Sequence, residues 1–366
     1  MRTRLRPEGS GEVSPKRAPE PAARRRIAVA EARVPFARDG AELHAQALVT
    51  QLRLRGHDAE SVALPFHGRK HELLDNACAW RMLNLTSSNA RPIDLLIATR
   101  FPTWFARHPR KVVWLIHQHR AAYDLYGTPY SDFTGSDEDT RLRDQIAALD
   151  SKMFAECERI VTNANNTADR LQRFNGIAAR PLYHPPPIAD RLHPGPYGDY
   201  VLLVSRLEPL KRVDLAIAAM TLVTAPIRLI IVGDGSERTA LEHEAAQRGT
   251  ANRITFAGAV WGDAVADLYA GALGVLYAPF DEDYGYVTLE AFLAAKPVIT
   301  AADSGGTLEF VRDGTNGFVC APDAAALAAA IDRLAGDRPL AERLGRAGQS
   351  VARAITWDGV IEQLLG

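Results

Sequence analysis

The sequence is poor in cysteine and has no long apolar run. Its three cysteines, Cys78, Cys157 and Cys320, are widely spaced among 366 residues and form no CxxC or Cys/His ligand pattern. We therefore expect neither a disulfide framework nor a zinc site, and a reducing cytoplasm suits the chain. No apolar run reaches the roughly 18 residues of a membrane-spanning helix, and the N-terminus lacks the apolar core of a signal peptide. We expect a protein that is neither integral to a membrane nor exported by that route.

An excess of one charge sign is also missing. The formal net charge is -1, so the chain has no general attraction for nucleic acid. Charge is concentrated only in residues 1–26, where eight Lys and Arg stand against three Glu without apolar periodicity. This segment is predicted to be a disordered basic tail. A solvated extension is the favoured interpretation, and weak peripheral contact with the inner membrane surface is the alternative.

Length and hydrophobic patterning predict two α/β domains. A chain of 366 residues suits two domains of about 150 residues each. The first domain, 27–187, is expected to contain strands at 27–32, 59–66, 93–99, 111–117 and 159–164, and helices over 42–54, 140–156 and from 165 to 174. Three consecutive prolines within 180–190 stop helix and sheet, so we place the linker there.

The second domain, 188–354, repeats this order. Its strands are expected at 200–205, 227–233, 253–258, 274–279 and 296–300, alternating with helices that begin near Val213, Glu237, Asp263 and Val287. The order predicts two Rossmann-like, doubly wound parallel sheets, whose strand carboxyl ends converge on a cleft. An isolated helix at 355–366 is expected to pack back on the first domain.

The stretch 281–300, DEDYGYVTLEAFLAAKPVIT, has the features of a ligand-binding loop. Two carboxylates, Glu282 and Glu290, are separated by seven residues, and Gly285 lies in a turn before the helix near Val287. Unpaired N–H groups and the helix dipole favour an anion such as a phosphate at that helix start. Glu290 would then bind hydroxyls beside the anion. An ordinary loop with solvated acids is the alternative.

Cations follow the first strand of the second domain. In VSRLEPLKRVD, Arg206 ends the strand and Lys211 precedes the next helix. A loop of this length brings both cations onto one diphosphate, where they would neutralise a leaving group without a metal. The alternative is that Arg206, Glu208 and Lys211 pair with each other at the surface.

Glycines occur where loops leave the predicted strands. Gly40 stands before the first helix, Gly233 follows a strand, and Gly305 and Gly306 precede a helical turn. Each lets the backbone approach a ligand closely; for Gly233 a structural turn is favoured, and for the pair at 305–306 a ligand contact. No GxGxxG fingerprint is present, which argues against a nicotinamide dinucleotide.

Histidines end a buried strand at WLIHQHR. His117 and His119 are expected beside the cleft, where one of them would bind substrate or polarise a reacting group. The alternative is that at least one of the two is hydrogen-bonded within the domain and does not contact substrate. No HExxH spacing accompanies them, so no metal is assigned. The aromatic and basic loop 100–111 is interpreted as a packed loop in preference to a membrane or acceptor contact.

Five motifs together carry a resemblance to a known family. VSRLEPLKRVDLAIAA, IVGDGSE, ITFAGAV, APFDEDYGYVTLEAFLAAKPVIT and SGGTLEFVRDGTNGFV occur in this order. The chain resembles the retaining glycosyltransferases of the GT-B fold, in the glycogen-synthase-like and mannosyltransferase-like group (glycosyl transferases group 1). The resemblance is strong over about 190–358 and weaker over 27–187.

The resemblance implies a role for each matching position. Arg206 and Lys211 match the diphosphate-binding pair, Glu282 the glutamate facing the donor sugar, Glu290 the ribose ligand and His117 the histidine beside the sugar. The backbone of Tyr284, Gly285, Tyr286 and Val287 would line the sugar and phosphates. The family usually has Gly where Arg212 stands, Phe-Gly-Leu where residues 284–286 stand, and Gly-Gly where Asp39-Gly40 stand.

The implied function is transfer of a sugar from a nucleoside-diphosphate sugar to an acceptor hydroxyl, with retention and without a metal or other cofactor. The acceptor is open: a glycan, a lipid-linked or a small molecule. The alternatives are a nucleotide-sugar epimerase on the same fold and a non-catalytic nucleotide-sugar-binding protein. The nucleotide base, the sugar and the linkage are not encoded in a readable pattern.

Overall fold

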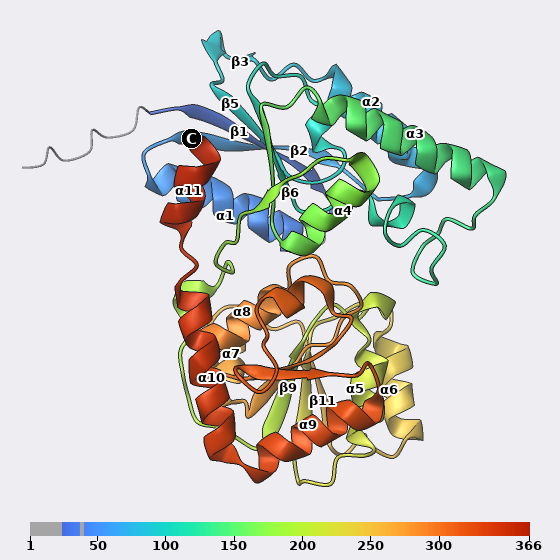
Figure 1. The fold of residues 1–366 in the computed structure, drawn as a ribbon, viewed down its shortest axis with the longest axis vertical. Coiled ribbons are helices and arrows are strands. Elements are labelled where there is room, and N and C mark those ends of the chain that lie inside the picture. Colours follow the sequence, from blue (N-terminus) through green and yellow to red (C-terminus); the bar gives the residue numbers. More distant parts are fainter. Residues whose placement is uncertain (1–23, 37–39) are drawn as a thin grey trace, which may run out of the picture.

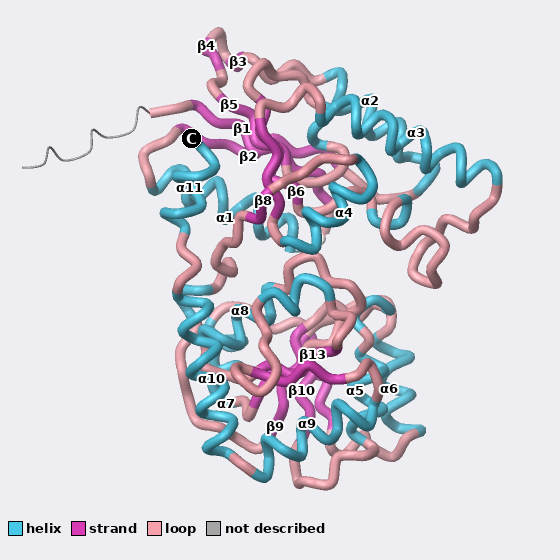
Figure 2. Tube along the Cα trace, in the orientation of Figure 1, coloured by secondary structure: helices cyan, strands magenta, loops and turns pink. Residues whose placement is uncertain are grey.

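The structure, a computed structural model, describes residues 24–36 and 40–366, which form two α/β domains, one above the other in Figure 1. Strands run through the middle of each domain with helices on both faces (Figure 2). Both six-stranded sheets are wholly parallel, so the predicted fold class is confirmed. The predicted tail lies outside the described residues up to Ala23, but Arg26 already begins β1 and is therefore not part of a tail.

The first sheet has the strand order β2-β1-β5-β6-β7-β8. Its central strands, β5 and β6, are buried along their whole length, as continuous apolar runs predict for parallel strands covered on both faces. The strands of this domain are β1 (Arg26–Arg33), β2 (Asp58–Pro65), β5 (Leu95–Ala98), β6 (Lys111–Leu115), β7 (Arg159–Thr162), β8 (Arg180–Pro181) and the small hairpin β3 (Ser87–Ser88) and β4 (Arg91–Pro92). Its helices are α1 (Gly40–Leu54), α2 (Leu73–Met82), α3 (Asp137–Phe154) and α4 (Asn165–Asn175).

The second sheet has the order β11-β10-β9-β12-β13-β14, the 3-2-1-4-5-6 order of a dinucleotide-binding fold. Its strands are β9 (Tyr200–Val204), β10 (Arg228–Val232), β11 (Ile254–Gly258), β12 (Gly274–Leu276), β13 (Val298–Ala301) and β14 (Gly317–Cys320). Its helices are α5 (Val213–Met220), α6 (Arg238–Gln247), α7 (Asp263–Gly271), α8 (Tyr286–Leu293), α9 (Ala324–Gly336) and α10 (Arg338–Arg353).

Several elements were not foreseen from the sequence: α2, β8, β14, α9 and α10. Two of them carry N-cap signals, since Asp323 accepts from the Ala326 N–H at the start of α9, and Asp337 from the Leu340 N–H at the start of α10. Strand β8 corrects the prediction that the segment 180–190 interrupts the sheet from its first residue. Arg180–Pro181 still pair with β7, because an edge strand tolerates a proline.

Helix α10 packs against helix α8. A Cβ on Gly348 would lie 2.3 Å from the Phe292 ring, so only glycine permits this contact between α10 and α8. After α10 the chain crosses to the first domain, where α11 (Trp357–Leu365) lies beside α1 (Figure 1). Its apolar side joins the core of the first domain through Val360, Ile361 and Leu364. The two domains are thus joined by the linker and by this returning helix.

The loop 100–111 is packed inside the first domain. Phe101, Trp104 and Phe105 are all buried, and the Trp104 indole N–H donates to Asp150 at 2.8 Å. These aromatic rings therefore face the core, and a membrane contact through them is excluded.

Candidate functional site

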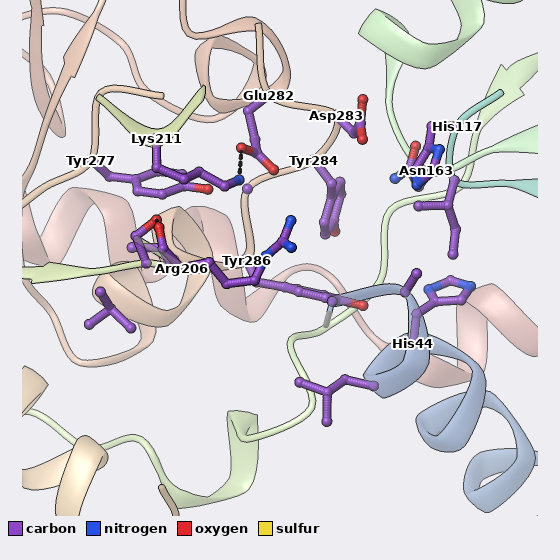
Figure 3. Close-up of a pocket in the computed structure, with 18 of the residues that line it drawn as sticks. His44, His117, Asn163, Arg206, Lys211, Tyr277, Glu282, Asp283, Tyr284 and Tyr286 are labelled. Atoms are coloured by element: carbon purple, nitrogen blue, oxygen red, sulfur yellow. Dashed lines mark hydrogen bonds and ion pairs between the residues drawn. The ribbon is translucent and has the colours of Figure 1, made fainter. Parts of the chain in front are cut away.

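A cavity lies between the two domains where the carboxyl ends of both sheets meet (Figure 3). Its walls come from the segments after β1, β5, β6, β7 and β8 in the first domain and after β9 and β12 in the second. The strand order reverses between β1 and β5 in the first sheet and between β9 and β12 in the second, and such points are where open α/β sheets bind ligands. The predicted site residues that line it are Gly40, His117, Arg206, Lys211, Glu282, Tyr284, Gly285, Tyr286 and Val287.

Lys211 and Glu282 form an ion pair in this cavity (Figure 3). Lys211 ends the short helix after β9, and Glu282 lies in the loop between β12 and α8. Their side chains are only 14% and 16% exposed, so both charges are largely removed from water and each depends on the other. The surface-pairing alternative is wrong for Lys211, whose partner is Glu282 across the cavity rather than Glu208.

Arg206 reaches the same cavity from the end of β9. Its guanidinium is 53% exposed and bonds to the Glu208 carboxylate at 2.6 Å. For Arg206 the structure thus shows the predicted surface pair. An exposed pair of this kind is weak, so an arriving anion competes for the guanidinium at little cost.

Helix α8 begins at the cavity. Gly285 is its N-cap residue at φ +79° and provides no side-chain cap, so the first-turn N–H groups carry the positive end of the dipole toward the cavity. A Cβ on Gly285 would lie 2.9 Å from the Thr307 hydroxyl oxygen. Glycine is required here both by conformation and by space.

His117 forms part of the first-domain wall together with Arg100 and Asn163. Its Nδ1 is 2.6 Å from the carbonyl oxygen of Gln118; since a carbonyl only accepts, Nδ1 carries the proton. Burial lowers the pKa of His117, against the opposing charge of Asp283. The ring is therefore neutral near pH 7, with Nε2 as an acceptor. His119 is instead half-buried against Phe66, Phe101 and Phe133 of the core.

Glu290 lies one turn along α8, behind the cavity wall. It does not line the cavity, and its carboxylate accepts from the Tyr269 hydroxyl at 2.6 Å. Burial raises the pKa of Glu290 to about 7, although the Tyr269 bond opposes this shift. The two glutamates of the predicted motif thus occupy different environments, one paired with a lysine and the other held by a neutral phenol.

The predicted glycines have different positions. Gly40 lines the cavity opposite the Tyr286 ring. The other three do not line it. A Cβ on Gly233 would lie 1.7 Å from the backbone carbonyl oxygen of Ser205. A Cβ on Gly305 would lie 2.5 Å from the backbone carbonyl oxygen of Glu282, and one on Gly306 would lie 2.3 Å from that of Asp283. Gly305 and Gly306 therefore support the loop that carries Glu282, from beneath.

An aromatic cluster joins the domains at the floor of the cavity. The rings of His184, in the linker, and Tyr284 stack at 4.6 Å and 7°. His184 Nε2 lies 2.6 Å from the Tyr286 hydroxyl and 2.9 Å from His44 Nδ1 of α1. Sequence inspection missed these histidines, and the YHPPP segment offered the one available signal for His184.

Asp283 is a further cavity residue that the sequence analysis did not single out. Burial would raise its pKa, but the charges of Arg120 and Arg170 outweigh that effect and hold the pKa below its usual range. Its position between Glu282 and Tyr284 in the motif was a signal, but its partners come from the other domain and are distant in sequence.

Within residues 24–36 and 40–366 no group of three or more His, Cys, Asp or Glu side chains is arranged to hold a metal ion. Among the same residues, no helix combines the length and apolarity that a membrane span requires.

Comparison with solved structures defines the fold class. Sucrose-phosphate synthase from Thermosynechococcus elongatus superposes with a TM-score of 0.76 at 18% identity, covering 93% of this chain and 97% of the other. HepE from Anabaena, solved in complex with UDP and glucose, gives 0.68 at 17% identity, covering 93% and 98%. The chain has the GT-B fold.

Sequence comparison adds the family. Residues 195–351, which make up most of the second domain, match the family described as glycosyl transferases group 1. The D-inositol 3-phosphate glycosyltransferases of Acidothermus cellulolyticus and Nocardia farcinica are each 32% identical to it, over 244 and 241 residues. Both alignments cover 59% of this chain. The chain spans about half the length of these relatives, 54% and 53%.

Proposed function

We propose that this protein transfers a sugar from a nucleoside-diphosphate sugar to an acceptor hydroxyl, with retention of anomeric configuration and without a divalent metal. The observation that carries the proposal is the cavity in which the Lys211–Glu282 pair, Arg206 and the N-terminus of α8 face one space between the domains. Two cations and a helix N-terminus supply three positive centres for a diphosphate. The family match and the UDP-bound state of HepE support the same class of donor.

Each group has a defined task in this proposal. Arg206, Lys211 and the start of α8 stabilise the negative charge that grows on the leaving diphosphate. Glu282 orients the sugar and stabilises its developing positive charge, while neutral His117 contacts a sugar hydroxyl from the first domain. The bond from the anomeric carbon to the diphosphate breaks, the acceptor oxygen bonds to that carbon from the same face, and its proton passes to the diphosphate.

A thermal-shift screen tests the donor class first. UDP-, GDP- and ADP-sugars are added to the purified protein, and a sugar nucleotide at one hundred times its dissociation constant should stabilise the fold by roughly 2.7 kcal/mol. Absence of any shift with all three classes contradicts the proposal. With the stabilising donor and a panel of hydroxyl acceptors, proton NMR then reports the anomeric configuration of the product.

Two controls separate the competing activities. Interconversion of the free sugar nucleotide without acceptor would show an epimerase, and binding without turnover on any acceptor would favour a binding protein. Full activity in EDTA is expected; loss of activity that Mg²⁺ or Mn²⁺ restores would contradict metal independence.

A further inference from the structure

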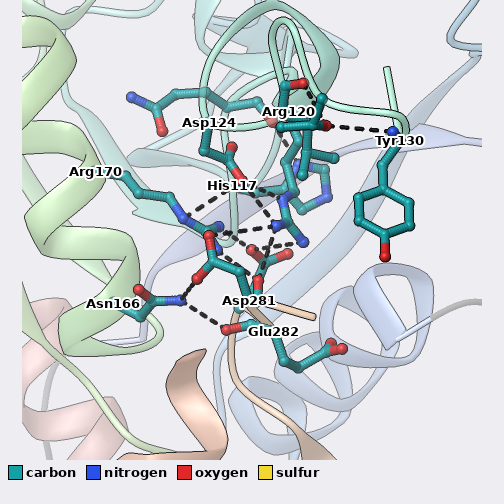
Figure 4. Close-up of polar contacts among 12 residues, drawn as sticks. His117, Arg120, Asp124, Tyr130, Asn166, Arg170, Asp281 and Glu282 are labelled. Carbon is teal, nitrogen blue, oxygen red and sulfur yellow. Dashed lines mark hydrogen bonds and ion pairs between the residues drawn. The ribbon is translucent and has the colours of Figure 1, made fainter. Parts of the chain in front are cut away.

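The loop that carries Glu282 is held by the first domain through a set of polar contacts shown in Figure 4. We name this set the α4 clasp and define it as Arg120, Asn166 and Arg170 of the first domain with Asp281 and Asp283 of the second. All five side chains are buried or partly buried. Asp124 of the first domain also pairs with Arg120 at 2.7 Å and with Arg170 at 3.6 Å, so both guanidiniums keep a partner when one contact to the loop is broken, whereas the charge of Asp283 is compensated by these two arginines.

The centre of the clasp is the backbone of Asp281. Its carbonyl oxygen accepts from Arg120 at 2.8 Å and from Arg170 at 2.7 Å, both through Nη2. Asp281 has φ +43°, a backbone conformation that non-glycine residues adopt at an energetic cost and keep only where their surroundings impose it. The two guanidiniums from the other domain thus hold the carbonyl of this residue, while its N–H donates to the Asp303 carbonyl of its own domain at 2.9 Å.

Asn166 and Arg170 stand one turn apart on α4, so they face the loop together. The Asn166 amide donates to the Asp281 side chain at 2.9 Å and to the Glu282 carbonyl at 2.8 Å. Arg170 also pairs with the carboxylate of Asp283, which lines the cavity. The clasp thus fixes the backbone on both sides of Glu282 while leaving its carboxylate to Lys211.

A second contact anchors α4 itself to the second domain. The Glu309 carboxylate accepts from the backbone N–H groups of Asn165 at 2.9 Å and Asn166 at 2.8 Å. A carboxylate at a helix N-terminus satisfies unpaired N–H groups and complements the helix dipole. The helix of one domain is therefore capped by a residue of the other, which fixes where Arg170 points.

We propose that Arg170, Asn166 and Arg120 are positioning residues, through which contact between the two domains sets the conformation of the Glu282 loop. Separation of the domains would remove three donors from the Asp281 and Glu282 carbonyls and release the strained residue. The part played by Glu282 in the cavity rests on the proposed function, whereas the hold of the clasp on the loop does not.

Hydrogen–deuterium exchange of the full chain without ligand tests the clasp directly. We expect Arg170→Met and Asn166→Ala to speed amide exchange in peptides covering 278–290 by about tenfold, with β6 and β9 unchanged. Arg170→Lys, which keeps the charge but loses the guanidinium fork, should give a smaller increase. Arg173→Met is the matched control, because Arg173 lies exposed on the same helix over the Phe174 ring.

Loop exchange equal to wild type in both Arg170→Met and Asn166→Ala would overturn the proposal. Exchange that rises equally in β6 would also overturn it, since that pattern marks a folding defect. If circular dichroism shows that Arg170→Met is unfolded, the loop exchange of Arg170→Lys and Asn166→Ala is compared with wild type instead.

Calorimetry with UDP, GDP and ADP, and turnover with the matching sugar nucleotides, provide a second measurement. Because the diphosphate is assigned to the second domain, Arg170→Met should change nucleoside diphosphate affinity less than threefold while lowering kcat at least tenfold. Equal losses in both would contradict a positioning role. Failure of all three nucleotides to bind the wild type would reject the proposed function and leave the exchange result standing.

Discussion

Lys211 and Glu282 pair across the cavity, and this pair links the cation predicted to bind a diphosphate to the carboxylate predicted to face the sugar. Both side chains are mostly buried, so water compensates neither charge well and each charge depends on the other. Under the proposed function, we expect an entering diphosphate to compete for Lys211 and so to free Glu282 for contact with the sugar.

The first prediction concerns this pair. Lys211→Ala should lower kcat/KM with the accepted sugar nucleotide by about 150-fold or more, which corresponds to about 3 kcal/mol of lost transition-state stabilisation. Arg206→Ala should produce a loss of similar size. Arg346→Ala is the control, since Arg346 pairs with Glu342 on the exposed face of α10 and should retain full activity. Unchanged turnover in both active-site variants would contradict their assignment.

The second prediction concerns the pH dependence of donor binding. We propose that Glu290, which lies behind the cavity wall and whose pKa burial raises to about 7, accepts the ribose hydroxyls best as the ionised carboxylate. Its ionised fraction falls as the pH decreases, so UDP, GDP or ADP should bind about tenfold more weakly at pH 6 than at pH 8. Glu290→Gln is the reference variant. The diphosphate of the nucleotide titrates in the same way with this variant, but the side chain at position 290 does not titrate. A ratio of wild-type to variant affinity that is independent of pH would reject the role of Glu290.

The third prediction concerns Asp150 and folding stability. Asp150 accepts from Trp104 at 2.8 Å and from the Tyr123 hydroxyl at 2.6 Å, and burial raises its pKa to about 7. Because the folded-state pKa lies above the unfolded value, this carboxyl stabilises the fold at low pH and loses that contribution as the pH rises through 7. Between pH 6.5 and 8 the loss in the free energy of unfolding should be about 1 kcal/mol.

Urea unfolding at both pH values, with Asp150→Asn as comparison, measures this contribution. The stability of the variant should change less with pH, because its amide does not titrate in this range. Equal pH dependence in the two proteins would show that Asp150 does not titrate in this range.

The fourth prediction concerns Arg212 and the strain in its backbone. Its φ of +48° is a left-handed conformation that costs a non-glycine residue about 1–2 kcal/mol. Its guanidinium donates to the carbonyls of Ala278 at 2.9 Å and Pro279 at 2.8 Å and pairs with Asp303 at 2.7 Å. These bonds fix the segment leading to Glu282, so they outweigh the strain. Arg212→Gly should destabilise the protein by about 1–3 kcal/mol in urea unfolding.

Arg212→Lys separates the cost of the backbone strain from the stabilisation by the guanidinium hydrogen bonds, because it keeps the left-handed backbone but removes the guanidinium. It should be at least as unstable as Arg212→Gly. A more stable glycine variant would mean that the strain, and not the hydrogen bonds, dominates at this position.

Local chemistry explains why much of the fold was predictable. The continuous apolar runs of β5, β6 and β9 and the glycine before α8 act over a few residues, and each predicted element of the two sheets is present. Helices α9 and α10 were missed although their Asp caps are local signals. They follow the last recognised motif, and small residues make up much of their buried faces, which in α10 consist of Leu340, Ala341, Leu344, Gly345, Gly348 and Ala352.

The site itself was predictable only in part. Position in a motif was sufficient to place Lys211, Glu282, His117 and Gly40 at one cavity, because strand carboxyl ends converge in parallel sheets. It could not distinguish the environments of Glu282 and Glu290, since burial and partners decide these. It also could not show that Gly305 and Gly306 support the loop from beneath.

What the sequence determined by itself was the alternation of strands and helices and the residue types at each strand end, which depend on neighbouring residues. Only the tertiary structure decided which groups meet: Arg170 contacts Asp283 over 113 positions of sequence, and His184 contacts His44 over 140. Such contacts depend on how two independently patterned domains pack against each other. No local periodicity records that packing, and it is this packing that holds the Glu282 loop in place.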